Sequence, residues 1–145
     1  MEAAHALLRS RGFGVLATFS RRAPEYPFAS VVTYAVDTSG SPVFLLSRLA
    51  LHTTNLLANP KASLLVLSED VENNPLDSAR VNFFGEIAVM PESEAAEARV
   101  LYLGRHPDSA QWIDFGDFAL YRMILAQAYY VGGFGVMGWV NLQAH

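Results

Sequence analysis

The segment "SRLALHTTNLLANPKASLLVL" (residues 47–67) joins two apolar runs through a polar middle. A hydrophobic strand ends at Ser47, and the spacing predicts a helix over residues 49–58. Asn59-Pro60 ends that helix, because the residue before a proline avoids helical geometry. Another strand is expected over residues 62–68. The segment is therefore a strand–helix–strand corner, and the predicted fold is built outward from it.

The same corner gathers polar side chains that a bland connection would not need. A helix beginning near Leu49 places His52 and Thr53 on one face, with Ser47 and Arg48 beside its unpaired backbone N–H groups. A helix N-terminus with a hydroxyl, an arginine and a histidine is a plausible phosphate site. The competing interpretation is a capping serine, a solvated arginine and a histidine bonded to a carbonyl group. The bare pattern favours this structural interpretation.

On either side of the corner the chain reads mainly as β-strands. Alternating or β-branched apolar runs predict six of them, over residues 13–19, 28–36, 43–47, 62–68, 79–90 and 118–131. Short helices are expected over residues 2–11 and after Pro91, and Gly85 is expected to bend its strand. Short connections favour an antiparallel sheet that closes on itself, so the predicted class is a mainly β barrel with peripheral helices. No linker divides the chain, which predicts one domain over residues 1–145.

Composition narrows the function. Hydrophobic residues make up 52% of the 145 residues and charged residues 17%, which favours a folded domain with apolar surface left for a partner subunit. A net charge of −4 argues against nucleic acid, and the absence of cysteine excludes thiol catalysis and disulfides. No apolar run approaches the length of a membrane span and the N-terminus does not read as a signal peptide, so a cytoplasmic protein without membrane association is expected.

Other motifs assign little chemistry. The four histidines are scattered without metal-ligand spacing, so no metal site is expected. The glycines of "VGGFG" (131–135) do not match a dinucleotide loop and favour a sharp bend or bulge. No nucleophile elbow is present, and the catalytic residues stay unassigned. Arg80 begins a strand among apolar residues, which is typical of a cation that faces solvent or an anionic partner.

Several stretches resemble a known family. The pattern "GVLATF…PFASVVTYAVDTSGSPVFLLSRLALHTTNLLANPKASLLV…ARVNFFGEI" is similar to the pyridoxamine 5′-phosphate oxidase-like, FMN-binding split barrels, nearest their haem-utilisation branch. "LLSRLALHTTNLLANPKASLLV" is the most specific part, and "DFALYRM" and "VGGFGVMGWV" also look like that branch. The resemblance implies a six-stranded antiparallel split β-barrel of the FMN-binding type, working as a homodimer with cofactor sites at the interface.

The resemblance also implies a set of FMN contacts. Ser30, Val31 and Val32 would line the phosphate and ring from the second strand. The phosphate segment would comprise Leu46, Ser47, His52, Thr53 and Asn55, and the helix-start pattern described above adds Arg48 to the predicted site. Arg80 would reach the flavin of the neighbouring subunit. Where the oxidases carry basic residues, this chain has Ser30, Leu51 and His52.

Three hypotheses follow. The first is a homodimeric FMN-binding flavoprotein, a small oxidoreductase whose small-molecule substrate is unknown. The second is a haem-binding or haem-degrading protein of the same fold, with a histidine such as His145 on the iron and Arg80 near a propionate or bound oxygen. The third is a non-catalytic dimeric module with a vestigial flavin pocket. Pyridoxamine phosphate oxidation is not expected, because the oxidases' C-terminal substrate-binding extension has no counterpart in this sequence.

Overall fold

The computed structural model describes residues 2–142 of the chain. One sheet of eight strands carries the fold, with three α-helices and a short 3₁₀ helix around it. In chain order the elements are α1 (Glu2–Ser10), β1 (Phe13–Phe19), β2 (Pro27–Thr33), β3 (Ala35–Val36), β4 (Pro42–Ser47), α2 (Leu51–Ala58), β5 (Lys61–Leu67), β6 (Arg80–Val89), α3 (Glu92–Arg105), η1 (Pro107–Gln111), β7 (Phe118–Gly133) and β8 (Val136–Asn141).

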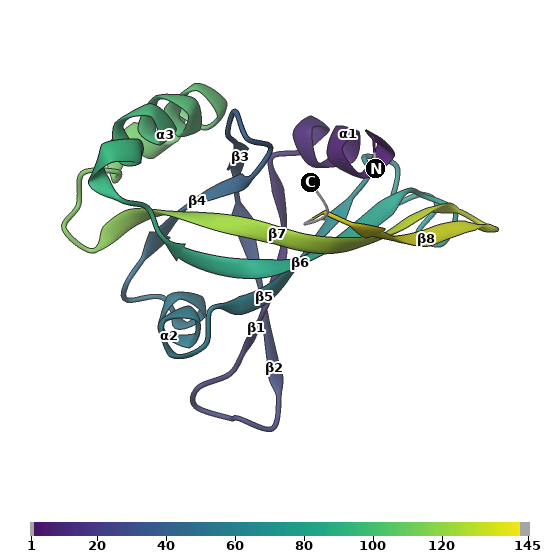
Figure 1. Cartoon of the computed structure of the whole chain (residues 1–145), viewed down its shortest axis with the longest axis horizontal. Coiled ribbons are helices and arrows are strands. Elements are labelled where there is room, and N and C mark those ends of the chain that lie inside the picture. The colour runs from purple at the N-terminus through teal and green to yellow at the C-terminus, as the bar shows by residue number, and fades with distance from the viewer. Residues whose placement is uncertain (1, 143–145) are drawn as a thin grey trace.

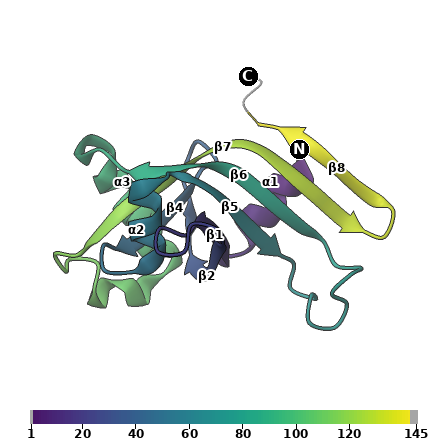
Figure 2. The same cartoon turned by 90° about the horizontal axis from the view of Figure 1, so that it is seen from below.

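The sheet is antiparallel throughout and curls into a half-barrel. Its strand order is β2-β1-β5-β6-β7-β4-β3, and β8 pairs with β7 outside this path. The long β7 holds the fold together, because its first residues pair with β4 and its last with β8. Figure 1 shows β6 and β7 running across the molecule, and Figure 2 shows the β7–β8 hairpin extending beyond the rest of the sheet.

The core lies on the concave face of the sheet. Leu16, Leu64, Phe83 and Met123 project into it from β1, β5, β6 and β7 and are fully buried. The helices α1 and α2 contribute further core residues. Strict alternation explains this arrangement, since every second side chain of a strand points to the same face. No helix among residues 2–142 is long and apolar enough to cross a membrane.

The mainly β fold and the half-barrel closure were predicted correctly, but the count of six strands is wrong. The predicted strand over residues 28–36 is divided at Tyr34, where the chain leaves its pairing with β1 and turns to pair with β4. The buried Tyr34 fixes this turn, because its N–H donates to the Gly12 carbonyl at 2.9 Å and its hydroxyl to the Leu8 carbonyl at 2.6 Å. The strand β8 was not predicted at all.

The two glycine predictions are confirmed. The register between β6 and β7 shifts at Phe84/Gly85, where the Gly85 Cα lies so close to the Ile124 carbonyl that a Cβ would collide with it. The "VGGFG" segment is the turn of the β7–β8 hairpin. Its Gly133 and Gly135 have φ of 126° and 80°, which glycine adopts without strain.

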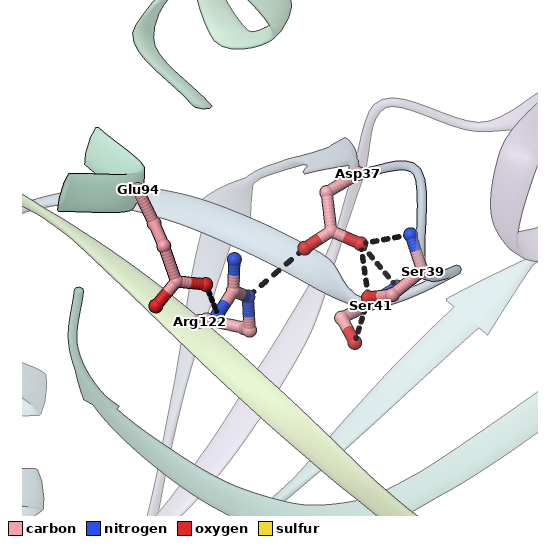
Figure 3. A network of polar contacts seen from close by, with 5 residues as sticks. All are labelled: Asp37, Ser39, Ser41, Glu94 and Arg122. Atoms are coloured by element: carbon pink, nitrogen blue, oxygen red, sulfur yellow. Dashed lines mark hydrogen bonds and ion pairs between the residues drawn. The ribbon is translucent and has the colours of Figure 1, made fainter. Parts of the chain in front are cut away.

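A polar clamp joins α3 and the β3–β4 turn to β7 (Figure 3). The Arg122 guanidinium donates to Asp37 at 2.9 Å and to Glu94 at 2.7 Å, while Asp37 also accepts from the backbone N–H groups of Ser39 and Ser41. Burial alone would raise the pKa of Asp37, but the bonds from Ser39, Ser41 and Arg122 outweigh it and lower that pKa. The clamp is therefore structural, with every partner drawn from the chain itself.

Candidate functional site

A groove with a volume of about 540 Å³ lies on the convex face of the sheet. It runs across β1, β5, β6 and β7, on the side opposite the core. Its lining is predominantly apolar with a few polar groups, as is typical of small-molecule sites. The lining residues are Ala17, Thr18, Phe19, Pro27, Lys61, Ala62, Ser63, Phe84, Gly85, Glu86, Ala126 and Gln127.

Strand register explains why a groove forms there. Ala17 lies opposite Ser63, which lies opposite Phe84, so small side chains occupy the convex face at the centre of neighbouring strands. The exposed Phe19 and the half-buried Phe84 bound this floor on either side. Trp139 of β8 packs against Phe84 with 5.5 Å between ring centroids, which extends the aromatic wall.

The rim of the groove carries opposite charges. Lys61 and Glu86 are cross-strand partners at its edge, yet no ion pair joins them in the described structure. The loop between β1 and β2, which adds Arg21 and Arg22, begins and ends at groove-lining residues. The Arg21 N–H donates to the Asn55 side chain at 2.9 Å, which fixes the start of this loop against α2. The edge of the apolar slot therefore carries one cation and one anion, and two arginines lie in the adjoining loop.

The predicted phosphate segment lies apart from the groove lining. Its helix begins at Leu51 rather than at residue 49, so Leu49 precedes the helix and is exposed. Ser47 Oγ accepts from the Leu49 N–H at 3.1 Å and donates to Asp117 Oδ2 at 2.6 Å. The Arg48 side chain donates to the Gly116 carbonyl at 2.9 Å. A carboxylate of the chain itself therefore stands where the sequence suggested an incoming phosphate.

His52 does not supply a positive charge. Burial lowers its pKa, so the ring is neutral near pH 7, and Nδ1 lies 3.2 Å from Ser30 Oγ. The hydrogen bond joins α2 to β2, which brings two predicted site residues together. Thr53, by contrast, is fully buried, and its hydroxyl has no hydrogen-bond partner in the described part of the chain. That orphaned hydroxyl is the one unexplained polar group in this helix.

Asn55 has a structural role. Its side chain is buried, donates to Thr18 Oγ1 at 3.1 Å and accepts from the Arg21 N–H at 2.9 Å. Both of its polar ends are thus used within the fold. Asn55 reaches the groove only indirectly, through Thr18 and the loop that begins at Arg21.

Arg80 is also occupied by its own chain. Its Nη1 atom donates towards the carbonyl groups of Pro75, Leu76 and Ser78 at 3.4, 3.1 and 3.3 Å, which fixes the loop before β6.

The remaining predicted residues are aliphatic. Val32 and Leu46 are buried, whereas Val31 is 70% exposed on the convex face. The structure therefore brings together Ser30 with His52 and Ser47 with Arg48, but it does not join them with Arg80 in one site.

The described histidines lie away from the groove. His106 Nε2 is 2.7 Å from the Tyr34 carbonyl, and His5 belongs to α1, whose Ala4 and Leu8 pack into the concave core. The predicted ligand His145 falls outside the described residues.

Sequence reasoning missed the groove itself. The alternation of β1 had already placed Ala17 and Phe19 on one face, but the residues opposite them depend on pairing with distant strands.

Comparison with known proteins places this geometry in context. The family model described as "CREG, beta-barrel" matches residues 1–145. A curated relative, the non-canonical heme oxygenase HOZ of Arabidopsis thaliana, is 41% identical over 120 residues, covering 83% of this chain and 36% of its own. The chain thus spans about a third of the length of that relative.

Two solved structures extend the comparison. A heme-binding protein from Mycobacterium smegmatis has a TM-score of 0.89 at 33% identity, with 97% of this chain and 57% of that one covered. A pyridoxinephosphate oxidase-family protein related to general stress protein 26, from Clostridium acetobutylicum, has a TM-score of 0.73 at 14% identity, covering 98% of this chain and 94% of its own. The second likeness concerns the fold alone, and it confirms the split-barrel class.

Proposed function

This chain belongs to the CREG β-barrel family, and we propose that it is a haem-binding split-barrel domain whose ligand occupies the convex groove. The observation that carries the proposal is the groove itself, an apolar slot with aromatic walls and Lys61 at its rim. Haem is a flat apolar ring with propionate carboxylates at one edge, and it needs that combination of surfaces. The names of the Arabidopsis and Mycobacterium relatives support the same ligand.

The proposal is tested by haemin titration of the purified protein, followed by the Soret band. Ser63→Trp fills the floor of the groove, so it should weaken haem binding at least about tenfold by steric exclusion. Val100→Trp is the matched control, because Val100 is 71% exposed on α3 and does not line the groove. Circular dichroism shows whether both variants fold. Haem binding that survives unchanged in Ser63→Trp would place the ligand elsewhere.

We also propose that the chain forms a homodimer through the convex face. Val31, Phe19, Met137 and Trp139 are between 57% and 70% exposed there, and so much exposed apolar surface is typical of an interaction site. Val31→Glu should shift the protein to monomers in sedimentation-velocity runs. Val100→Glu should not, although the two valines are equally exposed at 70% and 71%. Equal dimer populations in both variants would argue against this face.

FMN is the second candidate ligand, and the observation in its favour is the orphaned hydroxyl of Thr53, the residue that follows the Ser30-bonded His52 in α2. Against it stand the neutral His52 and the carboxylate of Asp117 next to Ser47. An FMN titration followed by flavin fluorescence tests it: micromolar binding that Thr53→Val weakens would favour FMN. Oxidoreductase and haem-degrading chemistry remain predictions, and the identity of the ligand decides between them. A cytoplasmic location also remains a prediction.

A further inference from the structure

We infer that the groove recognises the porphyrin ring and its carboxylates rather than the iron, so that its ligand class is dicarboxylate porphyrins with or without a metal. The inference rests on the proposed haem site and adds which parts of the ligand that site recognises. It begins with the groove lining, which includes no histidine, cysteine, methionine or tyrosine among the residues that the structure describes. Those four side chains are the usual protein ligands of haem iron.

None of the described histidines lines the groove, so as placed they do not reach iron bound there. His52 lies on α2 and is bonded to Ser30, while His106 follows α3 and is bonded to the Tyr34 carbonyl. His5 lies on α1, which packs on the concave side of the sheet. Iron in the groove would therefore find no ligand among the described lining residues of this chain, whose own contribution comes from contacts with the ring and its substituents.

The charges at the rim also favour recognition of the ligand's carboxylates. Lys61 is exposed, lines the groove and has no ion-pair partner in the described structure, although Glu86 lies opposite it in the strand register. A lysine that no carboxylate of the chain neutralises is free to pair with a carboxylate of the ligand. Glu86, at the same rim, opposes that pairing through like-charge repulsion. The two residues should thus affect carboxylate ligands in opposite directions.

The aromatic wall offers a direct readout. Trp139 packs on Phe84, a lining residue, whereas Trp112 packs in the separate cluster of Tyr102 and Ile113. In a Trp112→Phe background, quenching of Trp139 fluorescence reports occupancy of the groove for porphyrins with and without iron. Haemin, metal-free protoporphyrin IX and protoporphyrin IX dimethyl ester can then be compared on one scale.

We expect protoporphyrin IX to bind within about threefold of haemin, and the dimethyl ester at least about tenfold more weakly, because esterification removes the charge that Lys61 would meet. Lys61→Met should weaken both dicarboxylates about tenfold and leave the ester unchanged, and Glu86→Gln should strengthen them about twofold. Arg9→Met is the matched control, since Arg9 is an exposed cation on α1 away from the groove. These effects should shrink at high salt.

Three results would overturn the inference while leaving haem binding intact. They are haemin binding at least about tenfold tighter than protoporphyrin IX, ester binding as tight as that of the free acid, and a haemin affinity lost in His145→Ala. Failure of all three porphyrins to quench Trp139 would instead refute the proposed haem site itself, so the two failures are distinguishable.

Discussion

Asn55 offers the sharpest test of whether the corner between β4 and β5 is architecture or ligand site. The Asn55 amide is buried and bridges the Thr18 hydroxyl at 3.1 Å and the Arg21 N–H at 2.9 Å. Replacing Asn55 with alanine removes both hydrogen bonds, while the Thr18 hydroxyl keeps its weak bond to the Phe28 carbonyl at 3.4 Å. Each lost bond is worth about 0.5–1.5 kcal/mol, and truncation of a buried side chain adds to that cost. Because Arg21 is exposed and water can reach its N–H, we expect a total loss of about 2–3 kcal/mol.

Urea denaturation of the ligand-free protein measures this loss. With an m-value of about 1–3 kcal/mol/M, Asn55→Ala should lower the midpoint by about 1–2 M. Thr54→Ala is the matched control, because the Thr54 hydroxyl bonds only to the Leu51 carbonyl within the same helix. That variant should stay within about 0.5 kcal/mol of the wild type.

A double-mutant cycle isolates the buried pair. Asn55→Ala and Thr18→Val should show a coupling of about 1 kcal/mol, since the two side chains share one hydrogen bond. The reasoning is refuted if Asn55→Ala is as stable as Thr54→Ala, or if the cycle is additive. Unchanged stability together with weakened FMN binding would instead establish Asn55 as a cofactor ligand.

Three further predictions concern the clamp, the neutral histidine and the bulge. Asp37→Ala should cost about 1–3 kcal/mol in urea denaturation, because it removes the bonds that Asp37 accepts from Ser39, Ser41 and Arg122. Glu94→Ala removes one half-exposed ion pair and should cost under about 1 kcal/mol, and equal losses would contradict the clamp. Burial lowers the pKa of His52 from 6.5, so the unfolded chain binds a proton first and stability should fall as pH drops through 6.5. A His52→Gln variant should flatten that slope between about pH 7.5 and 5.5, and an unchanged slope would show that other groups cause it. Gly85→Ala should destabilise the fold by about 2 kcal/mol or more, because the new Cβ collides with β7. Gly104→Ala, in open space on α3, should stabilise it by about 0.5–1 kcal/mol. A Gly85→Ala variant that melts at the wild-type temperature would contradict the close approach.

Local patterns predicted the parts of the fold that local forces decide. The alternation over residues 13–19 matches β1 at both ends, and the proline after Asn59 ends α2 where expected. The bend at Gly85 was predictable because a glycine inside a strand marks either a bulge or a close contact. The split-barrel class came from resemblance rather than from these patterns, which alone suggested only a closed antiparallel sheet.

Elements that depend on distant partners were mispredicted. The apolar run over residues 28–36 has uniform strand propensity, so nothing local reveals that the chain changes partners at Tyr34. The strand β8 contains Gly138, and its pairing is specified by β7 through the hairpin. The groove is the same kind of feature. Ala17, Ser63 and Phe84 are unremarkable separately, and only the register between strands aligns them.

The contact between Ser47 and Asp117 was not predicted, because Asp117 lies 70 positions after Ser47 and outside the sequence pattern of the corner. Reading residues 47–55 alone, one counts a hydroxyl, an arginine and a histidine and infers an anion site. In the folded chain the carboxylate of Asp117, just before β7, lies beside Ser47. Burial lowers the pKa of His52, which disfavours its positive charge. Among the described residues that line the groove, Lys61 is the cation, and it has no carboxylate partner there. We therefore predict that a negatively charged ligand binds at the convex face, where a flat ligand also finds apolar walls, and not at the start of α2.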